Sequence, residues 1–309
     1  MRVLVTGGAG FIGSHSVDRL LANGWTVRIL DNFSSGSRKN LPTHPALEIL
    51  EGDIRQYETV KAAMEGVSHV LHLAAQVSVQ ASVENPPHSC STNILGFVNV
   101  LQAARSGGIQ RLVYASSAAV YGAPTRIPIV ETDACHPISP YGLEKQVNDQ
   151  YAGLFAEGFH LSLLGLRYFN VYGPRQDPRS PYAGVISKFL ARIEQYQPLL
   201  VYGDGSQTRD FIFVKDVARA NVAALESSLT GVCHVATGTS CNLLQMIDIL
   251  ARCTKRQLDI IHEAPMAGDI LFSSAKIDRF RELLNQERLT TLEQGLGLLV
   301  QDTIGLRSL

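Results

Sequence analysis

The sequence predicts an α/β protein: a doubly wound parallel sheet with a smaller α/β lobe beside it. Short apolar runs alternate with helical patterns through the first half of the 309-residue chain. A glycine-rich turn follows the first apolar run, and beyond about residue 168 the alternation gives way to proline, tyrosine and shorter elements. Apolar strands separated by helices are typical of a parallel sheet that helices cover on both faces.

The alternation defines the expected elements by their residue ranges. Strands are expected over residues 3–5, 27–30, 47–50, 69–73, 112–115 and 161–167, and helices over 14–23, 57–64, 92–106 and 141–157. Two later apolar stretches, 211–214 and 232–236, are expected to return to the same sheet. This places residues 1–168 plus 211–238 in the first domain and residues 169–210 plus 239–309 in the second lobe.

Composition excludes several classes of protein. Hydrophobic residues make up 45% of the chain and charged residues 18%, which indicates a globular protein. A net charge of −1 gives no general attraction to nucleic acid or to an anionic membrane. The five cysteines show no C-x-x-C spacing, which favours a reducing cytoplasm and predicts no metal site. No apolar run approaches 18 residues, so no transmembrane helix is expected.

Gly7, Gly10 and Gly13 form a G-x-x-G-x-x-G turn between the first strand and the first helix. Such a turn lets the backbone approach a pyrophosphate while the helix N-terminus faces its charge. The strand–turn–helix context makes the motif specific and predicts a Rossmann-like dinucleotide site.

Asp31 ends the second strand, about 20 residues past the glycines. A carboxylate there binds the adenosine ribose hydroxyls and repels a 2′-phosphate, so the expected cofactor is NAD rather than NADP. Arg38 and Lys39 are basic but are expected to form a solvated loop. Asp53 follows the third strand; an adenine contact and a simple turn carboxylate both remain open.

Tyr141 and Lys145 stand four residues apart and so share one face of a helix. Ser139 is a suitable N-cap and Pro140 a suitable first helical residue. A neighbouring cation and the helix N-terminus both favour a phenolate, so the pKa of Tyr141 is expected to fall. Such a pair can exchange protons with a hydroxyl group near neutral pH.

With these motifs in order, the chain resembles the extended short-chain dehydrogenase/reductase family, and within it the UDP-glucose and UDP-N-acetylglucosamine 4-epimerases. The resemblance covers nearly the whole chain. Besides the glycine turn it includes H-L-A-A at 72–75, S-S at 116–117, R-Y-F-N-V-Y-G-P-R at 167–175, G-D-G at 203–205, R-D-F-I-F-V at 209–214 and G-D at 268–269.

The resemblance implies an acid–base set of Ser117, Tyr141 and Lys145. Tyr141, as phenolate, takes the proton of the sugar C4 hydroxyl, Lys145 lowers its pKa and binds the nicotinamide ribose, and Ser117 hydrogen-bonds the same sugar oxygen. Ser116 remains an alternative to Ser117. The C4 hydrogen leaves as hydride to NAD and returns to the other face of the 4-keto sugar, so NAD is resident.

The resemblance also implies which residues form the cofactor site and the substrate site. The cofactor site comprises Gly7, Gly10, Phe11, Ile12, Gly13, Asp31, Asn32, Phe33, Ser34, Ser35, Gly36, Asp53, Ile54, Leu73, Ala74, Ala75, Asn93, Ser116, Tyr141, Lys145 and Phe169. The substrate site comprises Ser117, Asn170, Val185, Ile186, Val201, Tyr202, Arg209, Asp269 and Ser273. His72 and His234 are expected to be satisfied histidines near strand ends rather than catalytic groups.

Two departures from the family's sequence patterns narrow the choice among the reactions of its branches. Dehydratases and decarboxylases of the family place acidic residues where this chain has Ala118 and Ala119, which cannot transfer a proton, so both branches are disfavoured. Many epimerases carry a second phosphate-binding Arg where this chain has Met266; Arg175 or Arg179 could replace it. UDP-glucuronate 4-epimerase, with Arg179 on the carboxylate, and a non-catalytic NAD-binding regulator remain as alternatives.

The last expectations concern the sugar substituent near Ser273 and the pairing of two helices in a dimer. The position of Ser273 lines the pocket near the sugar 2-substituent in the resembling enzymes; a serine there leaves room for an N-acetyl group, which favours UDP-N-acetylglucosamine. Helices corresponding to 92–106 and 141–157 pair across a two-fold axis in such enzymes, so a homodimer is expected. The apolar residues expected to serve core and interface are Phe97, Leu101, Val147 and Phe155.

Overall fold

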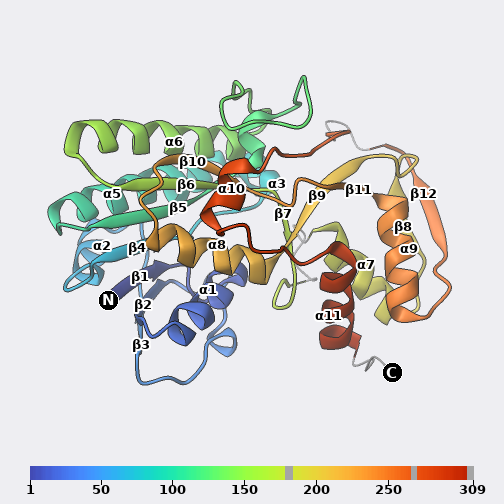
Figure 1. The fold of residues 1–309 in the computed structure, drawn as a ribbon, viewed down its shortest axis with the longest axis horizontal. Helices are drawn as coiled ribbons and strands as arrows, with labels where there is room; N and C mark the ends of the chain where they lie inside the picture. The colour runs from blue at the N-terminus through green and yellow to red at the C-terminus, as the bar shows by residue number, and fades with distance from the viewer. Residues whose placement is uncertain (178–183, 266–269, 305–309) are drawn as a thin grey trace.

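A seven-stranded parallel sheet forms the middle layer of the larger, left-hand part of the molecule in Figure 1. The computed structural model describes residues 1–177, 184–265 and 270–304. The strand order is β10-β6-β5-β4-β1-β2-β3, so the direction of winding reverses between β1 and β4. The strands are β1 (Arg2–Thr6), β2 (Thr26–Asp31), β3 (Leu47–Glu51), β4 (His69–His72), β5 (Arg111–Ser117), β6 (Leu163–Tyr168) and β10 (Gly231–Val235).

Helices cover both faces of this sheet, as expected for buried parallel strands. On β1, Val3 and Val5 join one hydrophobic core while Leu4 joins the other. The first core contains side chains of α1 (Phe11–Ala22), α8 (Val214–Glu226) and α10 (Asp278–Leu283). The second contains side chains of α2 (Tyr57–Ala63), α5 (Gly96–Ser106) and α6 (Pro140–Phe159).

The expected elements of the first half are confirmed, as is the return of 232–236, which pairs with β6 as part of β10. The expectation for 211–214 is wrong. These residues belong largely to β9 (Thr208–Phe213), which pairs with β7 (Asn170–Tyr172) and β11 (Ser240–Asn242) in a separate three-stranded sheet. Alternation along β9 puts Ile212 in the first core and Phe211 and Phe213 in a third core, so the strand joins the two lobes.

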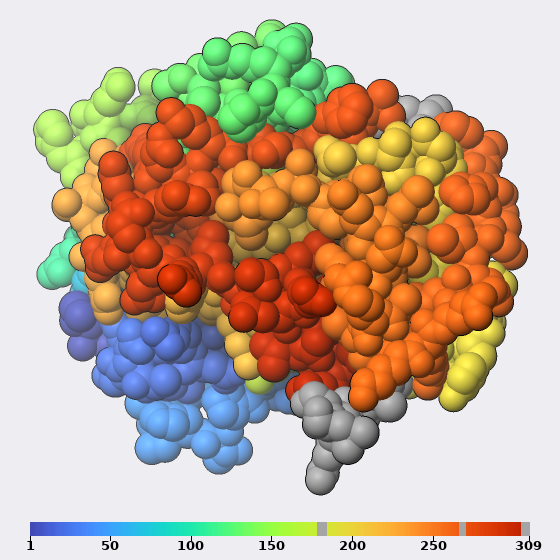
Figure 2. Space-filling view, turned by 45° about the vertical axis from the view of Figure 1, so that its right-hand side comes forward, coloured from blue at the N-terminus to red at the C-terminus, as the bar shows by residue number. Residues whose placement is uncertain are grey.

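The second lobe surrounds this third core. Its elements are α7 (Val185–Glu194), β8 (Leu199–Tyr202), α9 (Leu243–Thr254), β12 (Ile260–Glu263) and α11 (Leu292–Ile304), with β8 and β12 paired in parallel. Although α10 lies between β12 and α11 in sequence, its Phe280 packs in the first core. In Figure 2 the red segment that includes α10 and α11 lies between the blue N-terminal helices and the orange segment around α9.

Three short segments complete the fold near the sheet's carboxyl edge: α3 (Val79–Glu84), α4 (Pro86–Cys90) and a π-helical turn at Ser91–Leu95 that leads into α5. A 3-10 turn at Ala118–Tyr121 follows β5. Within the three described ranges, no helix is long and apolar enough to cross a membrane, and no cluster of three potential metal ligands occurs.

Candidate active site

A cleft of about 960 Å³ opens at the carboxyl ends of the parallel strands, where ligands bind in open α/β sheets. The cleft takes its walls from the turns after β1 to β6 and from the second lobe. The structure brings most of the predicted residues to it. All predicted cofactor residues except Phe33 and Asn93 line the cleft, together with Ser117, Asn170, Val185, Ile186, Arg209 and Ser273 of the predicted substrate residues.

Two positions of the glycine turn have no room for a side chain. Gly7 has φ +70°, and a Cβ there would stand 2.7 Å from the Ala74 backbone nitrogen. A Cβ on Gly13 would stand 2.1 Å from the Gly7 carbonyl oxygen. The turn therefore presses α1 against β1 and leaves bare backbone at the cleft, an arrangement that fits the pyrophosphate of a dinucleotide.

Asp31 stands beside this turn with both oxygens oriented by the backbone. It accepts hydrogen bonds from the Ala9 nitrogen at 2.9 Å and the Phe33 nitrogen at 2.8 Å. Arg38 is held away by an ion pair with Glu51 at 2.8 Å and lies 4.3 Å over the Phe33 ring. The anion at the end of β2 fits an unphosphorylated adenosine ribose. Phe33 supports Arg38 and does not line the cleft.

Asp53 lines the same part of the cleft but already has partners. Its oxygens accept hydrogen bonds from the Arg55 side chain at 2.7 and 3.0 Å, from the Arg55 backbone nitrogen, and from Asn32 at 3.1 Å. The Arg55 guanidinium, more than any other group, lowers the pKa of Asp53 to about 2. Both interpretations of Asp53, turn carboxylate and cofactor contact, are compatible with this position.

Tyr141 and Lys145 lie on one face of α6, and the predicted helix start is confirmed. The Ser139 hydroxyl accepts a hydrogen bond from the Gly142 nitrogen at 3.1 Å, and Pro140 is the first helical residue. Lys145 is buried, donates to the Ala115 carbonyl oxygen at 2.9 Å, and has its Nζ 5.9 Å from the centre of the Tyr141 ring.

The pKa shifts of this pair follow burial rather than the mutual attraction expected from the sequence. Burial lowers the pKa of Lys145 to about 8, although the Asp149 and Glu144 carboxylates act in the opposite direction. Burial likewise raises the pKa of the Tyr141 phenol; a hydrogen bond with Ser117 acts against the rise and Glu144 adds to it. The expected fall in the pKa of Tyr141 is therefore wrong for the protein alone, because desolvation of the phenolate dominates.

The two serines at the end of β5 differ in their contacts. Ser117 lies close enough to the Tyr141 phenol to act against the rise in its pKa, and the Ser117 hydroxyl accepts from the Ala119 nitrogen at 3.1 Å. Ser116 is buried, and its hydroxyl has no hydrogen-bond partner within the described part of the chain. The contact with the phenol favours Ser117 as the member of the acid–base set.

Asn93 does not reach the cleft. Held on the π-helical turn, it donates to the Gln76 carbonyl oxygen and to Glu144, at 2.8 and 2.6 Å, and accepts from the Gln76 nitrogen at 2.8 Å. Sequence reasoning missed Glu144 and its second donor, Ser89. A Glu in the first turns of a helix is common, and only the fold brings it to Asn93.

The second lobe supplies the other wall of the cleft. Val201 is fully buried in the third core and Tyr202 is exposed on β8, so the structure brings neither to the cleft. Of the cations considered for the diphosphate, Arg209 and Arg175 line the cleft, and Arg175 pairs with Asp18 at 2.8 Å. The predictions for Arg179, Met266 and Asp269 lie outside the described residues.

Ser273 lies on a segment, residues 271–276, that is fixed to the first domain. Ile129 donates its backbone N–H to the Ser274 carbonyl oxygen at 2.8 Å, and Lys276 donates to the Ile129 carbonyl oxygen at 2.7 Å. Ser273 is 9% exposed and, like Ile129, lines the cleft. A side chain at position 273 is thus presented into the cleft from a segment with little freedom to move.

The two conspicuous histidines have structural partners, as predicted. His72 is buried, which lowers its pKa to about 3, and its Nδ1 is hydrogen-bonded to the Thr6 hydroxyl at 2.8 Å. His234 is hydrogen-bonded to the Tyr121 hydroxyl and to the Lys276 carbonyl oxygen. His234 thereby also supports the segment that carries Ser273.

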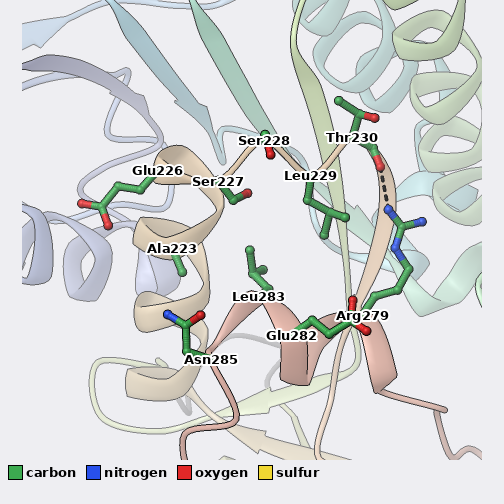
Figure 3. Close-up of a pocket in the computed structure, with 10 residues that line it drawn as sticks. All are labelled: Ala223, Glu226, Ser227, Ser228, Leu229, Thr230, Arg279, Glu282, Leu283 and Asn285. Carbon is green, nitrogen blue, oxygen red and sulfur yellow. Dashed lines mark hydrogen bonds between the residues drawn. The ribbon is translucent and has the colours of Figure 1, made fainter.

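A second hollow of about 600 Å³ lies between α8 and α10 (Figure 3). Its walls include the loop before β10, at the opposite edge of the sheet from the cleft. Arg279, one of its cations, donates to the Thr230 carbonyl oxygen at 2.7 Å. None of the predicted site residues lies there, so the cleft is the candidate active site.

Comparison with known proteins identifies relatives of this arrangement. The model of the NAD dependent epimerase/dehydratase family matches residues 3–235. A putative UDP-glucose 4-epimerase of Methanocaldococcus jannaschii is 41% identical over 270 residues, 87% of each chain. The UDP-N-acetylglucosamine 4-epimerase of Methanobrevibacter ruminantium, solved with UDP-N-acetylmuramic acid, is 37% identical with a TM-score of 0.95 over 98% of both chains. The Thermus thermophilus UDP-glucose 4-epimerase, solved with NAD, is 36% identical with a TM-score of 0.91 over 99% of both chains.

Proposed function

The chain belongs to the NAD dependent epimerase/dehydratase family, and we propose that it is a UDP-hexose 4-epimerase whose preferred pair is UDP-N-acetylglucosamine and UDP-N-acetylgalactosamine. The observation that carries the proposal is the set of Ser117, Tyr141 and Lys145 at the cleft. Ser117 is near enough to Tyr141 to act on its pKa, and Lys145 lies one helical turn beyond Tyr141. UDP-sugar 4-epimerases among the relatives support the same reaction.

Each residue has a role that its position allows. NAD supplies a reversible acceptor for the hydrogen at sugar carbon 4. Tyr141 takes the C4 hydroxyl proton during oxidation and returns it during reduction, and Ser117 orients the same oxygen. Lys145, anchored on the Ala115 carbonyl, keeps a cation beside the phenol. The glycine turn and Asp31 hold the dinucleotide, and Arg209 provides charge for the substrate diphosphate.

Ala118 and Ala119 separate this reaction from elimination or decarboxylation. Both line the cleft directly after Ser117. Removal of water or carbon dioxide from a sugar needs a further acid–base group near carbons 5 and 6, and neither methyl group can carry a proton. An oxidation and reduction at carbon 4 alone needs only the set already present.

Ser273 supports an N-acetylated substrate. Its small side chain faces the cleft from the fixed segment 271–276, which leaves volume that a tyrosine would fill. The hydroxyl is both donor and acceptor and is suited to an acetamide. We also propose a cytoplasmic homodimer, which the reduced cysteines and the apolar surface of α6 support.

A direct assay tests the proposal. Purified protein is incubated separately with UDP-N-acetylglucosamine, UDP-glucose and UDP-glucuronate, and the products are identified by NMR. We expect the C4 epimer of the acetylated sugar to form fastest. Conversion of UDP-glucuronate alone would support the alternative epimerase, and absence of any epimer from NAD-loaded protein would support a non-catalytic role.

A further inference from the structure

Glu144 is a buried carboxylate on the catalytic helix, three residues after Tyr141 and directly before Lys145. Residues three apart on a helix are surface neighbours, so Glu144 accompanies Tyr141 on one side of α6. Its exposure is 4%. A carboxylate this deeply buried is costly unless hydrogen bonds or charges offset the loss of water, so its presence needs an explanation.

Two hydrogen bonds fix the carboxylate, and both end on the same oxygen. Ser89 Oγ donates to Glu144 Oε2 at 2.7 Å, and Asn93 Nδ2 donates to it at 2.6 Å. Both donors are uncharged, so they orient the carboxylate without neutralising it. Hydrogen bonds to charged groups are stronger than neutral ones, which makes this a rigid attachment.

The attachment continues to the wall of the cleft. Asn93 also holds the backbone of Gln76, both its N–H and its carbonyl. Ala74, Ala75 and Val77, which flank Gln76, line the cleft. Glu144 thus connects the helix that carries Tyr141 with the loop after β4, and fixes the separation between the phenol and that wall.

Other charged groups packed against α6 lie elsewhere. On α3 and α4, Glu84, His88 and Cys90 are exposed. Arg105 of α5 lies over the ring of Phe159 at the far end of α6. Tyr114 of β5 and Arg167 of β6 contact Asp149, which lies two helical turns beyond Tyr141. Tyr121 is hydrogen-bonded to His234 and accepts a hydrogen bond from Arg167.

Lys145 therefore provides the positive charge beside Tyr141, and Glu144 the negative one. A negative charge in a poorly solvated site disfavours a second anion nearby, since Coulomb interactions are weakly screened there. The phenol responds in this direction, because the Glu144 carboxylate adds to the rise that burial causes in the pKa of Tyr141.

We propose that Glu144 is a positioning residue for Tyr141, and that its negative charge raises the lower end of the pH range in which Tyr141 can accept a proton. The proposal rests on the proposed role of Tyr141 as the acid–base group. Ser89 and Asn93 keep the charge in place, and Gln76 transmits the fixed geometry to the cleft wall. The charge adds to the effect of burial, which keeps the phenol protonated.

Glu144→Gln removes the negative charge and keeps the two hydrogen bonds. Because both donors point at one oxygen, an amide oxygen in that place accepts the same two hydrogen bonds. The control is Glu157→Gln, which removes the same charge from an exposed position near the other end of α6. Glu144→Asp keeps the charge and tests whether a shorter attachment is tolerated.

The readout is the titration of Tyr141 in NAD-loaded protein, followed by NMR of ¹³Cζ-labelled tyrosine and assigned with Tyr141→Phe. We expect Glu144→Gln to move the midpoint to lower pH by about one unit, the scale on which a neighbouring charge shifts a pKa. Glu157→Gln should leave it unchanged, and Glu144→Asp should stay closer to wild type. A Tyr141 signal that is the same in wild type and Glu144→Gln at every pH, or an upward shift, overturns the proposal.

The pH–rate profile gives an independent second readout. The acid limb of the epimerase rate should move to lower pH in Glu144→Gln, because the phenolate forms more readily. A purely structural role would lower the rate at all pH values without moving the limb. If no UDP-sugar is epimerised, the proposed function fails, yet the NMR titration still decides the role of Glu144.

Discussion

The Tyr141 phenol occupies a site that does not by itself stabilise its anion. Burial raises the pKa of Tyr141 and lowers that of Lys145 to about 8, so desolvation disfavours charge on both. Ser117 acts against this rise in the pKa of Tyr141, and the Lys145 ammonium stands 5.9 Å from the centre of the Tyr141 ring. The glycine turn and Asp31 would hold NAD at this cleft, and the positive charge of the oxidised cofactor would favour the phenolate that epimerisation needs.

Tyr141→Phe should lower the epimerase rate by about 10²–10⁴-fold, since only the group that exchanges the proton is lost. NAD binding and the free energy of unfolding should change little, because the ring keeps its packing. Steady-state kinetics, cofactor retention and urea unfolding check these outcomes together. Turnover close to wild type would show that another group carries the proton.

Ser273→Tyr should suppress conversion of UDP-N-acetylglucosamine far more than conversion of UDP-glucose. The added ring would occupy the volume proposed for the acetamide, and the segment is fixed to Ile129 by two backbone hydrogen bonds, so it cannot retreat easily. The ratio of kcat/KM for the two sugars measures the effect, with Ser273→Ala as a control that removes only the hydroxyl. Equal slowing of both sugars would place Ser273 outside the acetamide pocket.

At the scale of elements, the sequence predicted the features that depend on residues close together in the chain. The glycine turn and the Tyr141–Lys145 pair could be read from the sequence because each needs particular residue types at fixed spacing. The Glu144–Asn93 contact spans 51 residues and has no local signature. The apolar run in β9 predicted a strand. It did not predict the sheet to which the strand belongs, because a strand that contacts two cores is as apolar as a strand inside one large sheet.

Gly13→Ala should destabilise the first helix and weaken NAD binding. The new methyl would meet the Gly7 carbonyl oxygen, so the turn must open, at a cost of about 1–3 kcal/mol in the free energy of unfolding, as for other overpacked sites. Gly153→Ala is the matched control. It lies within α6 with no heavy atom within 4 Å of the added Cβ, and should raise the free energy of unfolding by roughly 0.5–1 kcal/mol.

Urea unfolding and NAD titration of both variants measure these changes. A Gly13→Ala protein with the stability and cofactor affinity of wild type would mean that the turn is not constrained as the structure indicates.

At the scale of the whole molecule, the surface of α6 is the feature that a single chain leaves unexplained. Phe97 and Leu101 were expected to serve the interface but are fully buried in the second core. The exposed apolar residues are instead Leu143, Tyr151 and Leu154. With Val147 they follow helical spacing along one face, a pattern that a second helix commonly covers. Which apolar residues of a helix face the core depends on how it packs, so the sequence alone could not separate the two groups.

Leu154→Lys should therefore convert a dimer into a monomer. Leu154 is 66% exposed on the apolar face, so a lysine costs the free chain little but would place a charge inside a closely packed helix pair. Light scattering coupled to size exclusion should give about twice the 33.6 kDa chain mass for wild type and one chain mass for the variant. Leu298→Lys, the same substitution at an exposed leucine of α11 in the other lobe, should remain dimeric. A wild-type protein that is monomeric at every concentration, or a dimer broken by Leu298→Lys and not by Leu154→Lys, would show that α6 does not form the interface.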